Sequence, residues 1–401
     1  MCNMEELYSE FETPCFILDE VKLEQNYKTL KEAFESNWSN QVIIGYSVKT
    51  NSLPWIIGWM YSHGAYIEVV SKTEYELARS LSIPHDKIIL NGPVKEDILE
   101  ESLKNDTIVN LDNFAEIEWI RENIHKFNSI KVGLRINFDL EAECPNETVI
   151  GTEPGRFGFN IENGSFEKAI RELSSIQSVK ICGLHLHHST KTRSLKIFKT
   201  LCEKAGFLSE LFLDKIEYVD IGGCLLGDKP GAPSYEEYAQ TVVNVLKAFP
   251  HFAEAKIIIE PGACLIASPF TYLCRVINER YVKGNKIVTT DGTLLHVNPM
   301  MHDINFQFEI KKITSRKVIK KQIIAGYTCI EKDRFRTLIE QEEIVRNDFI
   351  FIKNTGAYSI TLGALFINYF PNIYVLTTTG FKLIRKKWTI KNFLQNNEVF
   401  K

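Results

Sequence analysis

The sequence predicts an α/β fold: a (β/α)8 barrel of the TIM type, followed by a C-terminal antiparallel β domain that the N-terminal strand completes. Between residues 25 and 265, short apolar runs alternate with helical stretches, the pattern of βα units around a parallel sheet. After residue 265, β-branched runs follow one another without helix-length spacers, which is typical of antiparallel sheets. We therefore expect a barrel domain at 25–265 and a β-sandwich or barrel-like domain formed by residues 1–24 and 266–401.

Eight strand-like runs in the first part have the spacing of a (β/α)8 barrel. They are predicted at residues 41–48, 66–70, 87–91, 107–111, 131–137, 178–185, 216–220 and 256–259. Amphipathic stretches such as 73–80 and 194–212 supply helices between them. Because the carboxyl ends of barrel strands meet on one face, the polar residues that follow these runs are candidates for an active site.

The second part of the chain is predicted to contain strands only. The β-branched runs are at residues 270–276, 286–297, 317–325 and 348–353. Residues 11–18 have the same character, so we expect this early strand to join the C-terminal domain.

Composition excludes several classes of protein. The 401 residues are 44% hydrophobic and 24% charged, which is enough to form the cores of two domains. The net charge of -4 gives no attraction to nucleic acid or an anionic membrane. No apolar run approaches the ~18 residues that span a bilayer, and the acidic start at residues 1–6 does not resemble an export signal. We expect a cytoplasmic protein with neither nucleic-acid nor membrane partners.

The nine cysteines are scattered without CxxC spacing, which argues against both a disulfide framework and a structural zinc site. We expect most of them to be reduced and buried.

Lys49 stands at the polar end of the run 43–51, IIGYSVKTN, whose apolar part is predicted to be a buried strand. A lysine in this place either extends its ammonium to water or is held partly desolvated as an amine that can form an imine with a carbonyl group.

Two further strand ends carry residues that could form a site together with this lysine. The run 183–190, GLHLHHST, places three histidines at a strand end, where an imidazole can bind a metal, lie against a cofactor ring or bond to the backbone. The run 218–227, YVDIGGCLLG, ends a strand in glycines that either bind phosphate or form a plain turn, and it is neither a GxGxxG motif nor a P-loop.

Glu260 emerges directly from the apolar strand 256–259. A carboxylate there is costly to ionise unless a cation faces it, and a protonated pyridine nitrogen would be such a cation. The alternative is an acid in contact with solvent at the strand end. In the β domain, Cys329 is either a reactive thiol or a packed one, and Tyr358 either binds phosphate or packs.

In this order, the segments resemble the fold-type III pyridoxal-phosphate decarboxylases, the family of diaminopimelate, ornithine and arginine decarboxylases. Residues 46–51, YSVKTN, are similar to the family's YAVKAN motif, 134–137 to LRIN and 156–158 to KFG, with Arg156 in place of lysine. The resemblance implies that Lys49 holds the cofactor and that Cys329 contributes to the active site across a homodimer interface. It assigns cofactor contacts to Lys49, Glu68, Arg135, His187, Thr190, Gly222, Gly223, Glu260, Gly262 and Tyr358.

Departures from the family pattern fall where substrates are distinguished. The EPGR motif reads EPGA with Ala263, the RPxLY region at 298–302 has no arginine, and Ile330 replaces the usual acid after Cys329. These changes disfavour diaminopimelate and simple diamine precursors, because bidentate arginine contacts are not easily replaced. The pattern is closer to decarboxylases of siderophore and antibiotic pathways, whose substrates are conjugated to citrate or to a carrier protein.

The resemblance therefore implies pyridoxal 5'-phosphate-dependent decarboxylation of an amino acid or an amino-acid conjugate, either in siderophore- or antibiotic-type biosynthesis or with a diaminopimelate- or ornithine-like substrate. We expect Cys329 to return a proton to the substrate, and the substrate to be met by Asp333, Asn298 and His302. We expect no metal ligand. Two alternatives stay open: an amino-acid racemase on a related barrel, and a non-catalytic protein that binds the same cofactor.

Overall fold

The computed structural model describes residues 10–212, 215–227, 229, 231–302, 304–312 and 315–398. The acidic start at residues 1–6, on which the expectation about export rested, lies outside the described residues. The chain divides into two compact units, one made of Met1–Gln25 with Leu265–Lys401 and the other of Asn26–Cys264.

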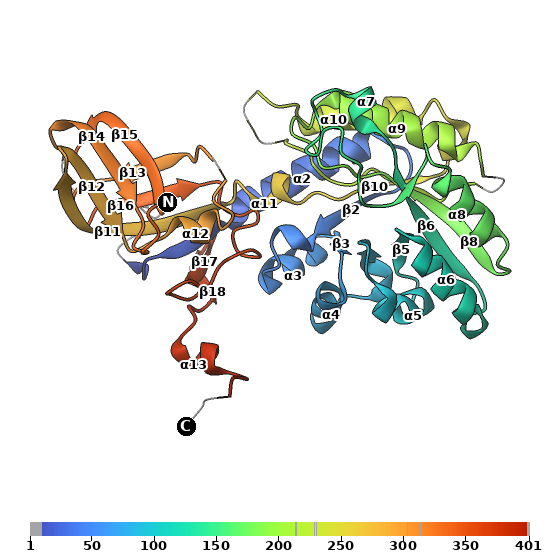
Figure 1. The fold of residues 1–401 in the computed structure, drawn as a ribbon, viewed down its shortest axis with the longest axis horizontal. Coiled ribbons are helices and arrows are strands. Elements are labelled where there is room, and N and C mark those ends of the chain that lie inside the picture. The colour runs from blue at the N-terminus through green and yellow to red at the C-terminus, as the bar shows by residue number, and fades with distance from the viewer. Residues whose placement is uncertain are drawn as a thin grey trace. The chain divides into compact units, whose positions relative to one another are not determined.

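The unit Asn26–Cys264 contains the predicted parallel barrel (Figure 1). Its strands follow the order β5-β4-β3-β2-β10-β9-β8-β6, and β6 pairs with β5 to close the ring. The strands are β2 (Val42–Ser47), β3 (Tyr66–Val69), β4 (Ile88–Leu90), β5 (Ile108–Leu111), β6 (Ile130–Asn137), β8 (Val179–His185), β9 (Tyr218–Asp220) and β10 (Lys256–Ile259). A two-residue strand, β7 (Phe159–Asn160), pairs with the end of β6. The prediction of a (β/α)8 barrel is confirmed.

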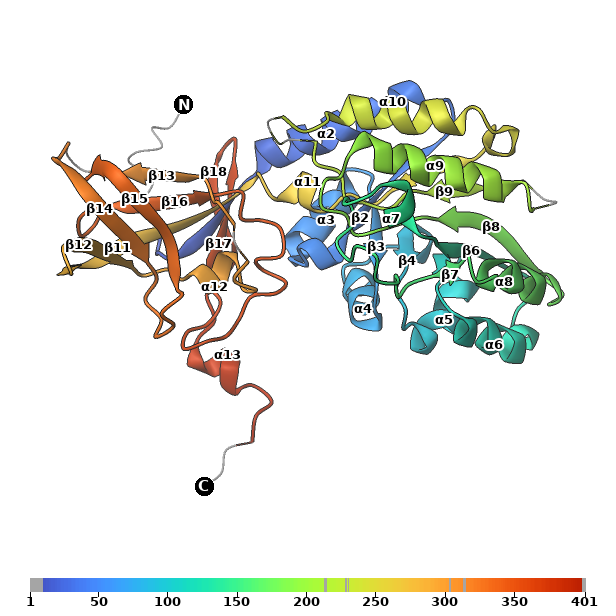
Figure 2. The ribbon, with the colours of Figure 1, turned by 45° about the horizontal axis from the view of Figure 1, so that its top comes forward.

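Helices alternate with these strands and cover the outside of the barrel (Figure 2). They are α3 (Pro54–Ser62), α4 (Lys72–Ser80), α5 (Glu96–Lys104), α6 (Phe114–Asn123), α7 (Leu140–Glu143), α8 (Ser165–Ser174), α9 (Leu195–Ser209) and α10 (Tyr235–Leu246). The helices α2 (Glu20–Asn37) and α11 (Ala263–Ile266) each cross a boundary between the units. Side-chain caps fix several starts, for example Ser234, which forms a capping box with Glu237 at α10. Within the described chain, no helix combines the length and the apolarity needed to cross a membrane.

Two glycines inside the barrel make room for one large side chain. A Cβ atom at Gly133 of β6 or at Gly183 of β8 would collide with the ring or hydroxyl of Tyr218. Tyr218 therefore points inward from β9, where it packs in a buried cluster with Ile43, Ile89 and Ile258 among others. Because the interior is this closely packed, any polar group in it must find partners inside the barrel.

A buried ion pair fixes the turn that follows β4. The Nζ atom of Lys95 lies 2.6 Å from a carboxylate oxygen of Glu116 and 2.6 Å from the carbonyl oxygen of Gly92. The second oxygen of Glu116 accepts a hydrogen bond from the backbone N–H of Asp112. The pair thus connects the loops after β4 and β5, and both charged groups depend on each other because neither reaches water.

The other unit is a nine-stranded sheet. Its strands run in the order β15-β14-β12-β11-β1-β17-β18, and β16 pairs with both β11 and β13. They are β1 (Cys15–Asp19), β11 (Phe270–Val282), β12 (Asn285–Thr290), β13 (Phe308–Lys311), β14 (Val318–Ala325), β15 (Arg334–Glu342), β16 (Phe349–Lys353), β17 (Asn372–Thr377) and β18 (Gly380–Arg385). Pairing is antiparallel except for β1 with β17 and β12 with β14. The early strand joins this sheet as predicted, but starts at Cys15, directly after Pro14, which has no N–H to donate.

One predicted strand of this unit, 286–297, was too long. The strand β12 ends at Thr290, and residues Leu294–Val297 form the short helix α12. A Cβ atom at Gly292 would meet Tyr272 and Cys274 at 2.8 Å, so the chain turns there through a space that only glycine fits. Thr293 then caps the new helix, since its hydroxyl accepts from the N–H of Leu295.

We predict that Lys95→Met lowers the free energy of unfolding by about 3–5 kcal/mol, because it leaves the Glu116 carboxylate buried without its cation. Urea denaturation followed by circular dichroism measures the change. The matched control is Lys104→Met, which removes an exposed partner of Glu100 and should leave the free energy of unfolding nearly unchanged. Equal effects of the two substitutions would contradict the prediction.

Candidate active site

A lysine and a glutamate meet at the carboxyl ends of two neighbouring strands. Lys49 lies in the 3-10 turn Val48–Thr50 after β2, and its Nζ atom is 2.6 Å from Oε2 of Glu68 on β3. The glutamate is 1% exposed, whereas the lysine side chain is 38% exposed and reachable from solvent. Burial raises the pKa of Glu68, but the Lys49 ammonium and hydrogen bonds from Ser47 and Asn91 outweigh it, so the pKa is lowered.

The same glutamate is connected to Glu260 through one amide. The side-chain nitrogen of Asn91 donates to Oε1 of Glu68 at 3.1 Å and to Oε1 of Glu260 at 2.5 Å. Burial raises the pKa of Glu260 well above its ordinary value, and the nearby acids Asp220 and Glu68 raise it further. Glu260 therefore needs either a proton or a cationic partner.

Asp220 is a third buried acid in this cluster. It accepts hydrogen bonds from the backbone N–H of Gly222 at 2.9 Å and from the amide of Asn110 at 3.4 Å. Burial raises the pKa of Asp220 to about 7. One ligand atom each from His185, Asp220 and Glu260 lie within 4.8 Å of one another, so this trio is the arrangement in the described chain that could hold a metal ion.

The glycine loop after β9 runs against the predicted imidazole. The Nδ1 atom of His187 accepts a hydrogen bond from the N–H of Gly223 at 3.2 Å, so the neutral ring carries its proton on Nε2. Burial and the positive charge of Arg135 lower the pKa of His187 well below its ordinary value. Gly222 has φ of +66°, and a Cβ atom there would collide with His187, while one at Gly223 would collide with the carbonyl of Glu260. Only glycines allow this close approach.

Other predicted cofactor contacts have features that fit an anionic group. Thr190 is buried and its hydroxyl has no hydrogen-bond partner among the described residues. A Cβ atom at Gly262 would collide with the hydroxyl of Thr50, so only glycine fits at this position. The guanidinium of Arg135 lies 3.4 Å from Asp112 and 3.5 Å from the carbonyl oxygen of His187, so it braces the histidine backbone. The amine of Lys49, the unpartnered hydroxyl of Thr190 and the closely packed backbone at the three glycines together fit pyridoxal phosphate.

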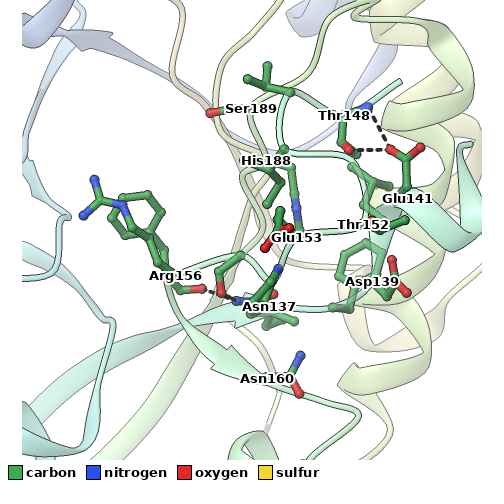
Figure 3. A pocket seen from close by; sticks show the side chains of 18 of the residues that line it. Asn137, Asp139, Glu141, Thr148, Thr152, Glu153, Arg156, Asn160, His188 and Ser189 are labelled. Atoms are coloured by element: carbon green, nitrogen blue, oxygen red, sulfur yellow. Dashed lines mark hydrogen bonds between the residues drawn. The ribbon is translucent and has the colours of Figure 1, made fainter. Parts of the chain in front are cut away.

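A cavity of 720 Å³ extends from His187 and Arg135 (Figure 3). Residues 148–157 form much of its wall, and the amide of Asn137 holds that loop by donating to the carbonyls of Gly155 and Phe157. Its carboxylates are Asp139, Glu141, Glu153 and Glu162. The cavity is larger than a small amino acid requires, and its walls combine apolar side chains with these carboxylates and other polar groups.

Arg156 stands at the same wall and contacts the ring of Phe157. Its guanidinium lies 4.2 Å from the ring centroid, and that of Arg135 lies 4.6 Å from the same centroid. The aromatic ring is thus shared by two cations.

Five predicted site residues belong to the sheet unit. Cys329 is exposed in the loop before β15. Asp333 is buried and accepts hydrogen bonds from the hydroxyls of Thr293 and Thr328 and from two backbone N–H groups, so its carboxylate holds this loop against the start of α12. Asn298 bonds with its side chain to the backbone of His302, which is exposed.

Tyr358 has φ of +60° and is 45% exposed. The left-handed conformation is uncommon for a residue with a large side chain, and such residues cluster at functional sites.

The sequence prediction missed Asn91 and Asn110. Asn91 is the last residue of a predicted strand, so the rule that selected polar residues at strand ends could have found it. Asn110 gave a weaker signal, a single polar residue within an apolar strand. His185 was noticed only as one of three histidines, but the structure shows it buried, with both ring nitrogens lacking a hydrogen-bond partner among the described residues.

Comparisons with known proteins agree with this geometry. A family model described as the pyridoxal-binding domain of pyridoxal-dependent decarboxylases matches residues 20–267. Diaminopimelate decarboxylase of Methanocaldococcus jannaschii is 26% identical, covering 98% of this chain and 93% of the relative. That of Zymomonas mobilis is also 26% identical, covering 98% and 94%.

Solved structures share the fold. The M. jannaschii diaminopimelate decarboxylase superimposes with a TM-score of 0.87 at 24% identity, covering 98% of this chain and 94% of the other. The Helicobacter pylori enzyme in complex with L-lysine gives 0.83 at 21% identity, with 98% coverage of both chains. A lysine/ornithine decarboxylase of Vibrio vulnificus with cadaverine gives 0.73 at 19% identity, covering 90% and 94%.

We predict that Asp220 makes the cofactor-free protein less stable as pH rises. The unfolded chain loses this proton near pH 4, whereas the folded chain keeps it to about pH 7. The folded state therefore binds more protons in this window, and its stability falls by up to about 1.4 kcal/mol per pH unit.

Urea midpoints at pH 5 and pH 7.5 measure this effect. Relative to the wild type, Asp220→Asn should become more stable at pH 7.5 than at pH 5, because its amide never has to ionise. A constant difference between the two proteins at both pH values would show that Asp220 does not titrate in this window.

Proposed function

The chain belongs to the family of pyridoxal-dependent decarboxylases, and we propose that its substrate is an amino acid enlarged by conjugation, as in siderophore or antibiotic biosynthesis. It is a carboxy-lyase that depends on pyridoxal 5'-phosphate. The observation that carries the proposed chemistry is the Lys49–Glu68 contact of 2.6 Å, at the strand-end face that also carries Glu260 and the glycine loop.

When bound, pyridoxal phosphate would supply an electron sink for the charge left by departing CO2. Lys49 would hold the cofactor between turnovers. To act as a nucleophile its Nζ atom must be an unprotonated amine, and Oε2 of Glu68 is placed to orient that nitrogen by accepting a hydrogen bond from it. The lysine side chain is 38% exposed, so its proton can pass to water, while the buried glutamate keeps the nitrogen in place.

We assign orientation of the cofactor to the remaining barrel residues. Glu260 would meet the ring nitrogen, where a positive charge would relieve the cost of burying the carboxylate. His187, braced by Arg135, would lie against the ring, and Gly222, Gly223, Gly262 and Thr190 would bind the phosphate. Tyr358 would add a phosphate contact.

We assign return of a proton at the substrate α-carbon to the thiol of Cys329. Asp333 would act through the loop that it holds, and Asn298 and His302 would meet the distal part of the substrate. The loop around Cys329 therefore determines where the thiol stands. In this assignment residues 25–265 bind the cofactor, and the β-sandwich or barrel-like domain of 1–24 and 266–401 supplies the proton donor.

Support for a conjugated substrate comes from two sources. Ala263 and Ile330 remove groups that would meet a distal carboxylate or amine, so a simple diamino acid has fewer partners. The cavity of 720 Å³ beside His187 offers room for an enlarged group with hydroxyls or charges. A carrier protein could present such a substrate.

Diaminopimelate is the second candidate substrate, because the curated relatives that cover nearly the whole chain are diaminopimelate decarboxylases. The same family argument supports a homodimer in which Cys329 serves the partner's barrel, and a cytoplasmic location.

We predict that Lys49→Ala abolishes the visible absorbance of the bound cofactor and lowers kcat by at least about 10³-fold, because no amine remains to hold the cofactor. Lys72→Ala, which removes an exposed lysine of α4, is the control and should leave both unchanged. Full turnover by the Lys49 variant would eliminate this assignment.

The substrate proposal predicts CO2 release from citryl- or carrier-linked amino acids, and not from free ornithine, lysine or diaminopimelate. Thr152→Trp, which narrows the cavity, should raise KM for the conjugate by about tenfold, since it removes on the order of 1–2 kcal/mol of binding. Val94→Trp, at an exposed position that is not part of the cavity lining, is the matched control. Turnover of diaminopimelate with an unchanged KM in the Thr152 variant would favour the second candidate.

A further inference from the structure

We propose that Tyr218 is a positioning residue, which acts through Asn110 and Asn91 to aim hydrogen-bond donors at the carboxylates of Glu68 and Glu260. This inference rests on the proposed placement of Glu260 opposite the cofactor ring. Tyr218 starts β9 and lies in the barrel interior, so it contacts neither substrate nor cofactor in this arrangement.

The contacts form an unbroken chain. The hydroxyl of Tyr218 donates to Oδ1 of Asn110 at 2.7 Å, and the amide nitrogen of Asn110 donates to Oδ1 of Asn91 at 2.9 Å. The amide nitrogen of Asn91 then donates to Glu68 at 3.1 Å and to Glu260 at 2.5 Å. We call these three residues, Tyr218, Asn110 and Asn91, the relay.

The direction of every bond in the relay is set by its ends. A carboxylate only accepts, so both N–H groups of Asn91 must point at the two acids and its oxygen must point at Asn110. Asn110 therefore turns its amide nitrogen toward Asn91, and its second N–H reaches Asp220 at 3.4 Å. Its own oxygen is left facing the barrel interior, where the Tyr218 hydroxyl is the donor that satisfies it.

The strands leave a space for Tyr218, and the burial of this residue keeps its hydroxyl protonated. Gly133 and Gly183, on β6 and β8, are the positions where any side chain would collide with the tyrosine. Burial also raises the pKa of Tyr218 well above its ordinary value, so the hydroxyl keeps its proton and remains a donor.

The relay affects how strongly Glu260 holds a proton. Among the residues that the structure describes, the titratable groups around it are Glu68, Asp220, Lys49, Tyr218 and His185, the last with a ring nitrogen 3.7 Å away. Of these neighbours, the two acids raise its pKa and Lys49 lowers it. The amide of Asn91 donates a hydrogen bond that favours the carboxylate form of Glu260. Without an oriented relay, the pKa of Glu260 would rise, and the proton would lie more on the carboxyl group and less on the ring nitrogen of the cofactor.

The test compares Tyr218→Phe with Tyr238→Phe in the cofactor-loaded protein. Tyr238 is also a buried tyrosine of the barrel unit, but its hydroxyl donates to the carbonyl of Arg193 outside the relay. The readout is the pH at which the visible absorbance of the loaded protein changes, with kcat and KM measured in parallel. Loss of one oriented hydrogen bond should move this pH upward by about 0.5 unit or more and lower kcat about threefold with little change in KM.

Asn110→Ser is the second relay variant, and Glu260→Gln tests the premise. An upward shift in Tyr218→Phe and Asn110→Ser, absent in Tyr238→Phe, supports the relay. If Glu260→Gln shifts the absorbance and neither relay variant does, the relay is overturned while the placement of Glu260 stands. If Glu260→Gln has no effect, the placement itself fails, and the relay with it. If Tyr218→Phe lowers stability without shifting the pH of the absorbance change, Tyr218 has a packing role alone and the relay is overturned. If Tyr218→Phe does not fold, the shift measured for Asn110→Ser decides the question.

Discussion

Three carboxylates buried at one end of a barrel are the constraint on which the rest of this site depends. Glu68, Asp220 and Glu260 are each at most 5% exposed, and the Lys49 amine is the cation in direct contact with one of them. Taking a carboxylate out of water costs more than any single hydrogen bond returns, so such groups need a proton, a cation or several donors. Each of these acids is stabilised by a different set of neighbouring groups, and these differences set their chemical roles.

Glu68 is stabilised by an ammonium, a hydroxyl and an amide, which keep it ionised and able to accept a hydrogen bond from Lys49. Glu260 has one amide donor and two acidic neighbours, which leaves it in need of positive charge. A protonated ring nitrogen would provide that charge, so the same burial that destabilises the empty site would strengthen cofactor binding. Asp220, beside them, acts on the backbone through Gly222 and completes the polar cluster.

The backbone at several glycines determines how closely the loops and strands approach the polar side chains of the site. Gly222 and Gly223 pass so close to His187 and Glu260 that a methyl group would not fit, and the Gly223 N–H selects the neutral imidazole tautomer. Glycine deeper in the barrel, at 133 and 183, leaves a space for Tyr218. The small residues thus do more than permit turns, because they determine which large polar side chains enter the interior. The cavity beside His187 is lined by residues other than these three acids, so its walls can vary without disturbing them.

The sequence by itself determined the barrel, the β domain and most of the segments that meet at the site. Those features depend on local periodicity and on polar residues at strand ends, such as Lys49 and Glu260, which are visible in a linear pattern. Only the tertiary structure decided that Asn91 bridges two acids and that Asn110 and Tyr218 stand behind it. Asn110 and Tyr218 lie on β5 and β9, while Asn91 and Glu260 directly follow β4 and β10, and the latter two are 169 positions apart in the sequence. The tertiary structure likewise ended the strand predicted at 286–297 after Thr290, since the space at Gly292 is set by Tyr272 and Cys274 on the neighbouring β11. Periodicity records which face of a strand is buried, whereas the partners on that face are fixed by how the strands pair and close.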